Sequence, residues 1–239
     1  EGGVGALAVS SGQAASLIAV LNIAKAGDDV VASSTLYGGT FNLLHSTLRK
    51  LGINTIFVEG ETYEDYEKAI TPKTKCLFTE MVGNPKLNVL DIEAAAKAAH
   101  KHNIPLIVDN TVPSPYLCRP FEWGADIIVH SLTKYISGHG NSMGGMIVDS
   151  GSFDWKASGK FPDLVEPDES YHGITYAEKF GQGGAFITKC TAQLMRDFGS
   201  IQSPQNAFYL NLGLESLHVR MERHSENALA VAQFLQSHP

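Results

Sequence analysis

The sequence is short of cysteine, of long apolar runs and of basic residues, and each shortage excludes a class of protein. Its three cysteines, Cys76, Cys118 and Cys190, are odd in number and widely spaced. This favours free thiols in a reducing, cytoplasmic compartment over a disulfide framework or a zinc site. No run of about 18 apolar residues is present, so we expect no transmembrane helix and no membrane partner. The 18 Lys and Arg are scattered and outnumbered by 25 Asp and Glu, which argues against a nucleic-acid partner.

The chain has 239 residues, of which 44% are hydrophobic, enough for one large domain or a domain and a half. Residues 151–184 form a polar, aromatic segment rich in Gly and Pro that is too long for an ordinary connection. The chain opens on Glu1 instead of Met and closes just after a helix-like stretch, so we expect a fragment of a longer protein. We therefore expect an N-terminally truncated large domain over residues 1–203. Residues 204–239 are expected to form a connecting helix that leads to a further domain.

Short apolar runs alternate with helical patterns along most of the chain. The runs are apolar on both faces and several contain β-branched residues, as expected for strands buried on both faces. The alternation predicts an α/β fold with a mainly parallel sheet and helices on both faces. The expected strands are residues 6–10, 30–32, 55–58, 76–80, 106–109, 127–130 and 145–148. The expected helices are residues 13–26, 40–51, 63–70, 92–102, 184–198 and 204–236.

Polar residues stand at the ends of several runs, which is where ligands bind in open α/β sheets. Gly12 and Gln13 directly follow the first run, and the free N–H groups of a helix start suit an anion such as phosphate. A plain helix cap is the alternative. Asp109 ends another buried run, so its carboxylate needs a cationic partner, either a protonated pyridine nitrogen or a nearby Arg or Lys. A structural Asp that caps the next two residues is the alternative.

A lysine with two hydroxyl residues follows the sixth run. In an extended segment the side chains of Ser131 and Thr133 face one side, where they can hold a phosphate while Lys134 reaches the ligand's aldehyde. The Gly-rich residues 138–142 come next and do not suit a helix face, which argues against an ordinary surface lysine. Tyr37 precedes two glycines, so its ring is open to stack on a flat cofactor, with simple packing as the alternative.

As a set, these motifs resemble the Cys/Met-metabolism family of pyridoxal-phosphate enzymes. The resemblance covers nearly the whole chain and implies the aspartate-aminotransferase-like fold, in particular the large domain of fold type I. Within the family, the segment 115–120, the Gly-rich loop and the insertion between residues 159 and 173 are similar to members that act on O-acetylhomoserine. The stretches that carry the family resemblance are residues 11–15, 37–40, 83–85, 109–111, 124–126, 130–135, 138–140 and 213–225.

The resemblance implies pyridoxal 5′-phosphate as the cofactor and no metal. Its phosphate would accept hydrogen bonds from the backbone N–H groups of Gly12 and Gln13. The side chains of Ser131 and Thr133 would bind the same phosphate. Many relatives have Met at the position of Gln13, a change that a backbone role tolerates.

The resemblance also assigns residues to the cofactor ring. Tyr37 would stack on the ring and assist proton transfer, and Asn84 would hydrogen-bond the ring oxygen. Asp109 would bind the ring nitrogen and keep it protonated. Lys134 would carry the cofactor as a Schiff base and then act as general base.

The implied reaction is a γ-replacement on a small amino-acid substrate. O-acetylhomoserine and sulfide or methanethiol would give homocysteine or methionine and acetate. A cystathionine γ-synthase or γ-lyase of the same family is the nearest alternative. A nucleotide-binding α/β module and a structural fragment that serves oligomer assembly are non-enzymatic alternatives. Relatives form dimers paired into tetramers, so we expect a homo-oligomer for the full-length protein.

Two parts of the relatives are missing from this sequence. Relatives carry an upstream segment whose Tyr and Arg reach the phosphate of a neighbouring subunit. They also carry a C-terminal domain whose Arg binds the substrate carboxylate. The sequence is therefore expected to hold much of the cofactor site without the whole substrate site.

Overall fold

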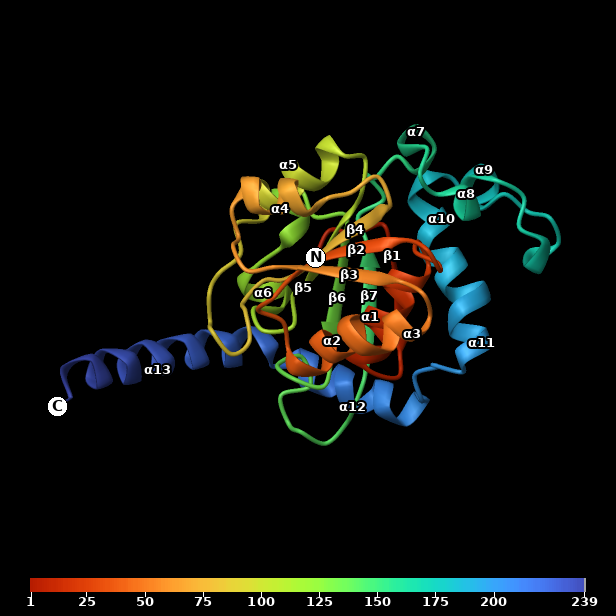
Figure 1. Cartoon of the computed structure of the whole chain (residues 1–239). Coiled ribbons are helices and arrows are strands. Elements are labelled where there is room, and N and C mark those ends of the chain that lie inside the picture. Colours follow the sequence, from red (N-terminus) through yellow and green to blue (C-terminus); the bar gives the residue numbers. More distant parts are fainter. Residues whose placement is uncertain (239) are drawn as a thin grey trace.

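Seven strands form one sheet in the computed structural model, which describes residues 1–238. Their order across the sheet is β1-β7-β6-β5-β4-β2-β3 (Figure 1). β7 is antiparallel to both of its neighbours, and every other neighbouring pair is parallel. The strands are β1 (Gly5–Val9), β2 (Asp29–Ser33), β3 (Asn54–Val58), β4 (Thr74–Glu80), β5 (Leu106–Asp109), β6 (Ile127–Ser131) and β7 (Gly145–Asp149).

This sheet confirms the expected α/β class. Each expected strand is present, with bounds that differ by at most two residues from the expected ones. Because only β7 runs the other way, the carboxyl ends of all the other strands meet at one edge of the sheet. The loops that follow β1, β2, β4, β5 and β6 therefore converge, and this convergence builds the site described below.

Helices cover both faces of the sheet, as expected. On one face α1 packs through Ala15, Ile18 and Ala19 in a buried cluster that includes Val30 and Ile107 of the sheet. A second buried cluster on the other face contains residues of α4 and α5. Within residues 1–238 no helix is both long and apolar enough to cross a membrane. The helices that lead up to the insertion are α1 (Gly12–Leu21), α2 (Gly38–Asn42), η1 (Leu43–Thr47), α3 (Leu48–Lys50), α4 (Tyr63–Ala69), α5 (Ile92–Lys101), α6 (Ser114–Leu117) and η2 (Pro120–Trp123).

The first and last expected helices differ from their expected extents. α1 ends at Leu21, and the next residue, Asn22, is bonded outside the helix: its side chain donates to the carbonyl of Phe186 at 3.0 Å, and its carbonyl accepts from Lys189 Nζ at 2.9 Å. The expected helix 204–236 is broken at Ser216 into α12 (Pro204–Glu215) and α13 (Leu217–Ser237). From residue 222 onward α13 is exposed along its length and projects away from the body (Figure 1).

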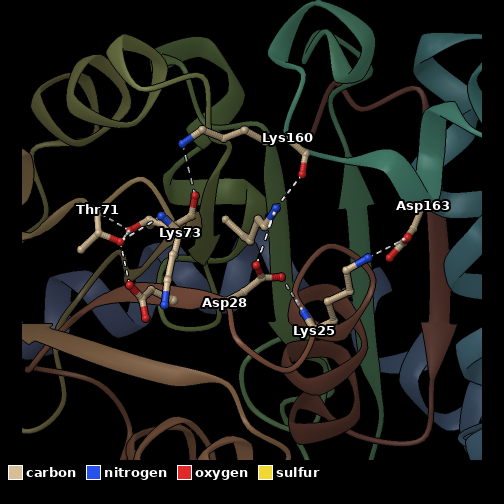
Figure 2. Close-up of polar contacts among 9 residues, drawn as sticks. Lys25, Asp28, Thr71, Lys73, Lys160 and Asp163 are labelled. Atoms are coloured by element: carbon tan, nitrogen blue, oxygen red, sulfur yellow. Dashed lines mark hydrogen bonds and ion pairs between the residues drawn. The ribbon is translucent and has the colours of Figure 1, made fainter.

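The expected long loop, residues 151–184, contains several short helices. It is anchored at the amino ends of β2 and β4, where Lys25 forms an ion pair with Asp163 at 3.2 Å (Figure 2). Lys75 donates to the carbonyl of Lys160 at 2.7 Å, and the Lys160 amine reaches the carbonyl of Thr74 at 3.4 Å. The insertion is therefore fixed far from the carboxyl edge. The helices from this segment to the expected C-terminal helix are α7 (Trp155–Ser158), α8 (Pro162–Val165), η3 (Glu169–Tyr171), α9 (Tyr176–Phe180), α10 (Gln182–Lys189), η4 (Cys190–Met195) and α11 (Arg196–Phe198).

Candidate active site

A cavity of about 580 Å³ opens at the carboxyl edge of the sheet. All eight residues proposed from the sequence as site residues line it, although they come from five different loops. The lining residues are Ser11, Gly12, Gln13, Ser16, Tyr37, Thr40, Glu80, Asn84, Asp109, Thr111, Val112, Ser131, Thr133, Lys134, Tyr135, Gly138, Gly140, Met143 and His224.

The turn between β1 and α1 lies directly against the end of β6. Ser11 caps α1, because its hydroxyl accepts from the backbone N–H of Ala14 at 3.1 Å. A Cβ atom on Gly12 would meet the Ser131 Cβ at 2.6 Å and its Cα at 2.9 Å, so only glycine fits here. In the described part of the chain the N–H groups of Gly12 and Gln13 have no acceptor, and they are the free donors of a helix start.

The Gln13 side chain is used within the protein. Its amide nitrogen donates to the carbonyl of Gly39 at 3.0 Å, and its carbonyl oxygen accepts from the Thr40 hydroxyl at 3.2 Å. These bonds tie α1 to α2, the helix that Tyr37 precedes. The Gln13 side chain is therefore held toward α2, while its backbone N–H lies at the start of α1.

Asp109 ends β5 with one carboxylate oxygen bound and one open. Its Oδ1 accepts from the backbone N–H of Thr111 at 3.0 Å and also from the Thr111 hydroxyl. That hydroxyl in turn accepts from the backbone N–H of Ser131 at 2.7 Å. Among residues 1–238 no donor reaches Oδ2. Burial raises the pKa of Asp109, whereas the Thr111 hydrogen bonds and His130 oppose that rise. A cation placed at Oδ2 would favour the ionised carboxylate further.

Glu80 is a site residue that the sequence analysis missed. It ends β4 beside Asp109 in the parallel ladder, and its Oε2 accepts from the backbone N–H of Tyr37 at 2.7 Å. Burial and the neighbouring charge of Asp109 raise the pKa of Glu80 to about 8. The signal was available, because Glu80 stands at the end of a buried run just as Asp109 does.

Lys134 lies on a turn, not on an extended segment. β6 ends at Ser131, and the backbone N–H of Lys134 donates to the carbonyl of Ser131 at 3.3 Å. The expectation of an extended segment over residues 131–133 is therefore wrong, although Ser131 and Thr133 both line the cavity. The Thr133 hydroxyl also contacts the backbone of Gly144, at 3.3 and 3.4 Å. The Lys134 side chain is exposed, and its Nζ has no hydrogen bond or ion pair in the described chain.

Two further predicted residues reach the cavity from loops. Tyr37 is 47% exposed, and its ring lies over Gly39, where a Cβ atom would meet it at 2.5 Å. Asn84 is exposed on a loop that Asn88 fastens, through donation to Thr35 at 3.1 Å and to Glu61. The backbone N–H of Asn84 donates to the carbonyl of Thr35 at 3.1 Å, which leaves its side chain toward the cavity.

The open groups of this cavity match one kind of ligand. Free N–H groups at a helix start suit a phosphate, a half-bound carboxylate suits a protonated ring nitrogen, and an unpaired amine suits an aldehyde. A family profile described as "Cys/Met metabolism PLP-dependent enzyme" matches residues 1–239. The chain belongs to this family. The resemblance inferred from the sequence is thereby confirmed, as is the family's use of pyridoxal phosphate.

Relatives and solved structures agree with this assignment. The chain is 54% identical to an O-acetyl-L-homoserine sulfhydrylase of Leptospira meyeri and 49% identical to a homocysteine/cysteine synthase of Kluyveromyces lactis. It is fully covered in both matches and spans about half of each relative, 55% and 54%. A crystal structure of a putative O-acetylhomoserine (thiol)-lyase from Campylobacter jejuni, which contains N'-pyridoxyl-lysine-5'-monophosphate, superposes with a TM-score of 0.93 at 40% identity. This match covers the whole chain and 59% of that structure.

Proposed function

We propose that this chain is the cofactor-binding part of an enzyme that exchanges the acetate group of O-acetylhomoserine for sulfide or methanethiol. The products would be homocysteine or methionine, and acetate. The observation that carries the proposal is that Lys134 and Asp109 line one cavity, and that Nζ of Lys134 and Oδ2 of Asp109 have no partner among residues 1–238. The names of the relatives favour O-acetylhomoserine as the substrate.

The role proposed for each residue follows from which of its polar atoms have no hydrogen-bond partner in the described chain. Pyridoxal phosphate, when bound, supplies an electron sink for carbanion chemistry. The N–H groups of Gly12 and Gln13 bind its phosphate, with Ser131 and Thr133 beside them. Asp109 Oδ2 would keep the ring nitrogen protonated, because a buried carboxylate beside that nitrogen favours the nitrogen's charged form.

The remaining groups act on the ring and the substrate. Lys134 Nζ anchors the cofactor, and once a substrate amine has displaced it, the amine of Lys134 takes the α-proton as general base. Tyr37 covers the ring and assists proton transfer, and Asn84 hydrogen-bonds the ring oxygen. Lys134 would also move a proton from the β-carbon, which allows acetate to leave the γ-carbon. The sulfur nucleophile would then add at that carbon, and protons would return to the β- and α-carbons.

We also propose that residues 1–203 form the cofactor domain and that residues 204–239 lead to a further domain. The exposed outer half of α13 supports this division. A homo-oligomer, a dimer or tetramer, is proposed for the full-length protein, in the cytoplasm. Its free cysteines support a reducing compartment, since Cys76, Cys118 and Cys190 are all unpaired thiols.

Borohydride trapping tests the lysine assignment. The full-length protein, incubated with pyridoxal phosphate, reduced and digested, should yield one modified peptide, the one that contains Lys134. Lys134→Ala should lose the label and the turnover, whereas Lys86→Ala, on the Asn84 loop, should keep both. A label on another lysine, or its survival in Lys134→Ala, overturns the assignment.

Substrate comparison tests the reaction. O-acetylhomoserine with sulfide should release acetate and form homocysteine, at a kcat/KM well above that for cystathionine or methionine. Faster cleavage of cystathionine or methionine would favour a γ-lyase, and faster addition of cysteine to an activated homoserine would favour a cystathionine γ-synthase. Binding of a nucleotide in place of pyridoxal phosphate would favour the non-enzymatic module.

A further inference from the structure

The turn that carries Lys134 has little regular structure of its own to fix it. It lies beyond the end of β6, and its internal backbone bonds run from the N–H groups of Lys134, Ser137 and Gly138 to the carbonyls of Ser131, Leu132 and Lys134. On the side of β7, the Leu132 N–H donates to the carbonyl of Gly144 at 2.9 Å and the Thr133 hydroxyl contacts the same residue, and these contacts end there. The residues after Lys134 therefore depend on what holds the turn from its other side.

Arg220, in the first turn of α13, holds it. Its Nη1 donates to the carbonyl of Tyr135 at 2.7 Å, and its Nη2 donates to the carbonyl of Ile136 at 3.2 Å. Nη2 also donates to the carbonyl of Gly213 at 2.8 Å, and Nε donates to the Ser216 hydroxyl at 2.9 Å. The guanidinium thus joins the two residues after Lys134 to the break between α12 and α13. No carboxylate in the described chain competes for it.

Two glycines show how close this junction is. A Cβ atom on Gly138 would lie 2.3 Å from Arg220 Nη1 and 2.4 Å from its Cζ. A Cβ atom on Gly213 would lie 2.1 Å from the carbonyl oxygen of Ser137. The backbones of Gly213 and Ser137 therefore touch without a side chain between them, a contact that only glycine at position 213 permits, and Gly138 leaves room for the guanidinium where it now lies.

Apolar side chains complete the junction. Leu132 and Ile136, which flank Lys134, are buried in one cluster with Leu210, Leu217 and Met221 of α12 and α13. One turn beyond Arg220, His224 lines the cavity, and its ring lies 5.7 Å from that of Tyr135, edge to face. Both sides of Lys134 are thus held by the same two helices.

We propose that Arg220 is a positioning residue for Lys134, which holds the carbonyls of Tyr135 and Ile136 so that the lysine amine points into the cavity. The inference rests on the proposed attachment of pyridoxal phosphate to Lys134. A merely structural arginine would lower the melting temperature when removed and leave the chemistry of Lys134 unchanged. If Arg220 positions Lys134, its removal would instead change how the lysine amine reacts with the cofactor.

The experiment compares Arg220→Ala with Arg223→Ala in the full-length protein. Arg223 is on the same helix, but its side chain is 73% exposed and within residues 1–238 it pairs with Glu226 alone, so its loss is the matched control. In folded Arg220→Ala we expect kcat to fall on the order of 100-fold with a much smaller change in KM, because displacement of a reacting group by about 1 Å has that effect. The pH at which the absorbance of the lysine-linked cofactor changes should also shift. Methylguanidinium in the buffer should restore part of both properties in Arg220→Ala and change neither in Arg223→Ala.

The outcomes separate this inference from the proposed function. If the wild type attaches cofactor at Lys134 and Arg220→Ala keeps its kcat and spectral pH profile, the positioning role is wrong and the function stands. If the wild type attaches no cofactor at Lys134, the proposed function is wrong. Should Arg220→Ala fail to fold, Arg220→Lys is measured instead, since an ammonium cannot span all four acceptors. A wild-type kcat and pH profile in Arg220→Lys then overturns the inference, and a reduced kcat with a shifted profile supports it.

Discussion

One lysine at the amino edge of the sheet, Lys75, is held by partners, whereas Lys134 at the carboxyl edge has none in the described chain. Lys75 donates to the carbonyl of Lys160 at 2.7 Å and lies 3.7 Å from Asp28, with only 16% of its side chain exposed. Lys134 at the other edge is exposed and unpaired in the described chain. The two lysines therefore differ in role: Lys75 joins the insertion to the sheet, whereas Lys134 faces the cavity.

Carboxylates differ in what they face more than in how they are bonded. Asp126 at the amino edge accepts from His100 and from the backbone N–H of Leu106, each at 2.8 Å and both at Oδ2. Asp109 at the carboxyl edge likewise accepts through one oxygen, Oδ1, within residues 1–238, but it lines the cavity. Asp149 at the amino edge accepts from the Gly151 N–H at Oδ1, its Oδ2 has no partner in the described chain, and burial raises its pKa to about 7. Paired groups stabilise the fold, whereas open groups beside a cavity are available to a ligand.

The largest effect is expected at Gly12, where the end of β6 lies too close to leave room for a side chain. Gly12→Ala should lower cofactor affinity on the order of 100-fold, because the new Cβ must move either the end of β6 or the N–H groups that bind phosphate. Gly38→Ala is the control, since nothing lies within 4 Å of a Cβ there. Titration of each variant with pyridoxal phosphate measures the difference. Equal affinities would remove Gly12 from the site.

The positions of polar residues along single strands were predictable from the sequence. Gly12, Asp109 and Lys134 each follow a short apolar run, and in a parallel sheet such ends meet. The same rule was enough to predict Glu80 and was not applied to it. Apolar alternation likewise predicted every strand, because strands buried on both faces leave a signal within a few residues.

Features that depend on contacts between residues far apart in the sequence could not be predicted. The break at Ser216 and the role of Arg220 depend on carbonyls about 85 residues away, which no local pattern records. Asn22, which directly follows α1, is bonded to Phe186, 164 residues further along the chain. The extended conformation expected around Thr133 is absent because the chain turns back after Ser131, with the Ser137 N–H bonded to the carbonyl of Leu132 and the Thr133 hydroxyl bonded to Gly144.

A smaller and purely structural effect is expected at the amino edge. Lys75→Ala removes a charged donor from the carbonyl of Lys160 and should lower the free energy of unfolding by about 2 kcal/mol. For a domain of this size that is roughly 6 °C in Tm. Lys73→Ala is the control, because Lys73 is exposed and only its backbone is hydrogen-bonded (Figure 2). Thermal melts measure stability, and cofactor affinity should be unchanged in both. A loss of affinity in Lys75→Ala would contradict the separation of the two edges.

The last prediction concerns the pH dependence of stability at Glu80. Its pKa is raised from the usual 4.5 to about 8, so the folded protein binds a proton there that the unfolded chain releases between those values. The free energy of unfolding must then fall as pH rises through this window. Glu80→Gln keeps an oxygen acceptor for the Tyr37 N–H and carries no charge beside Asp109, so its stability should fall less from pH 5 to pH 8. Glu222→Gln, on the exposed part of α13, is the control and should follow the wild type. Denaturant unfolding without cofactor at several pH values gives the curves. Parallel curves for the wild type and Glu80→Gln would show that Glu80 is already ionised in the folded protein, against this prediction.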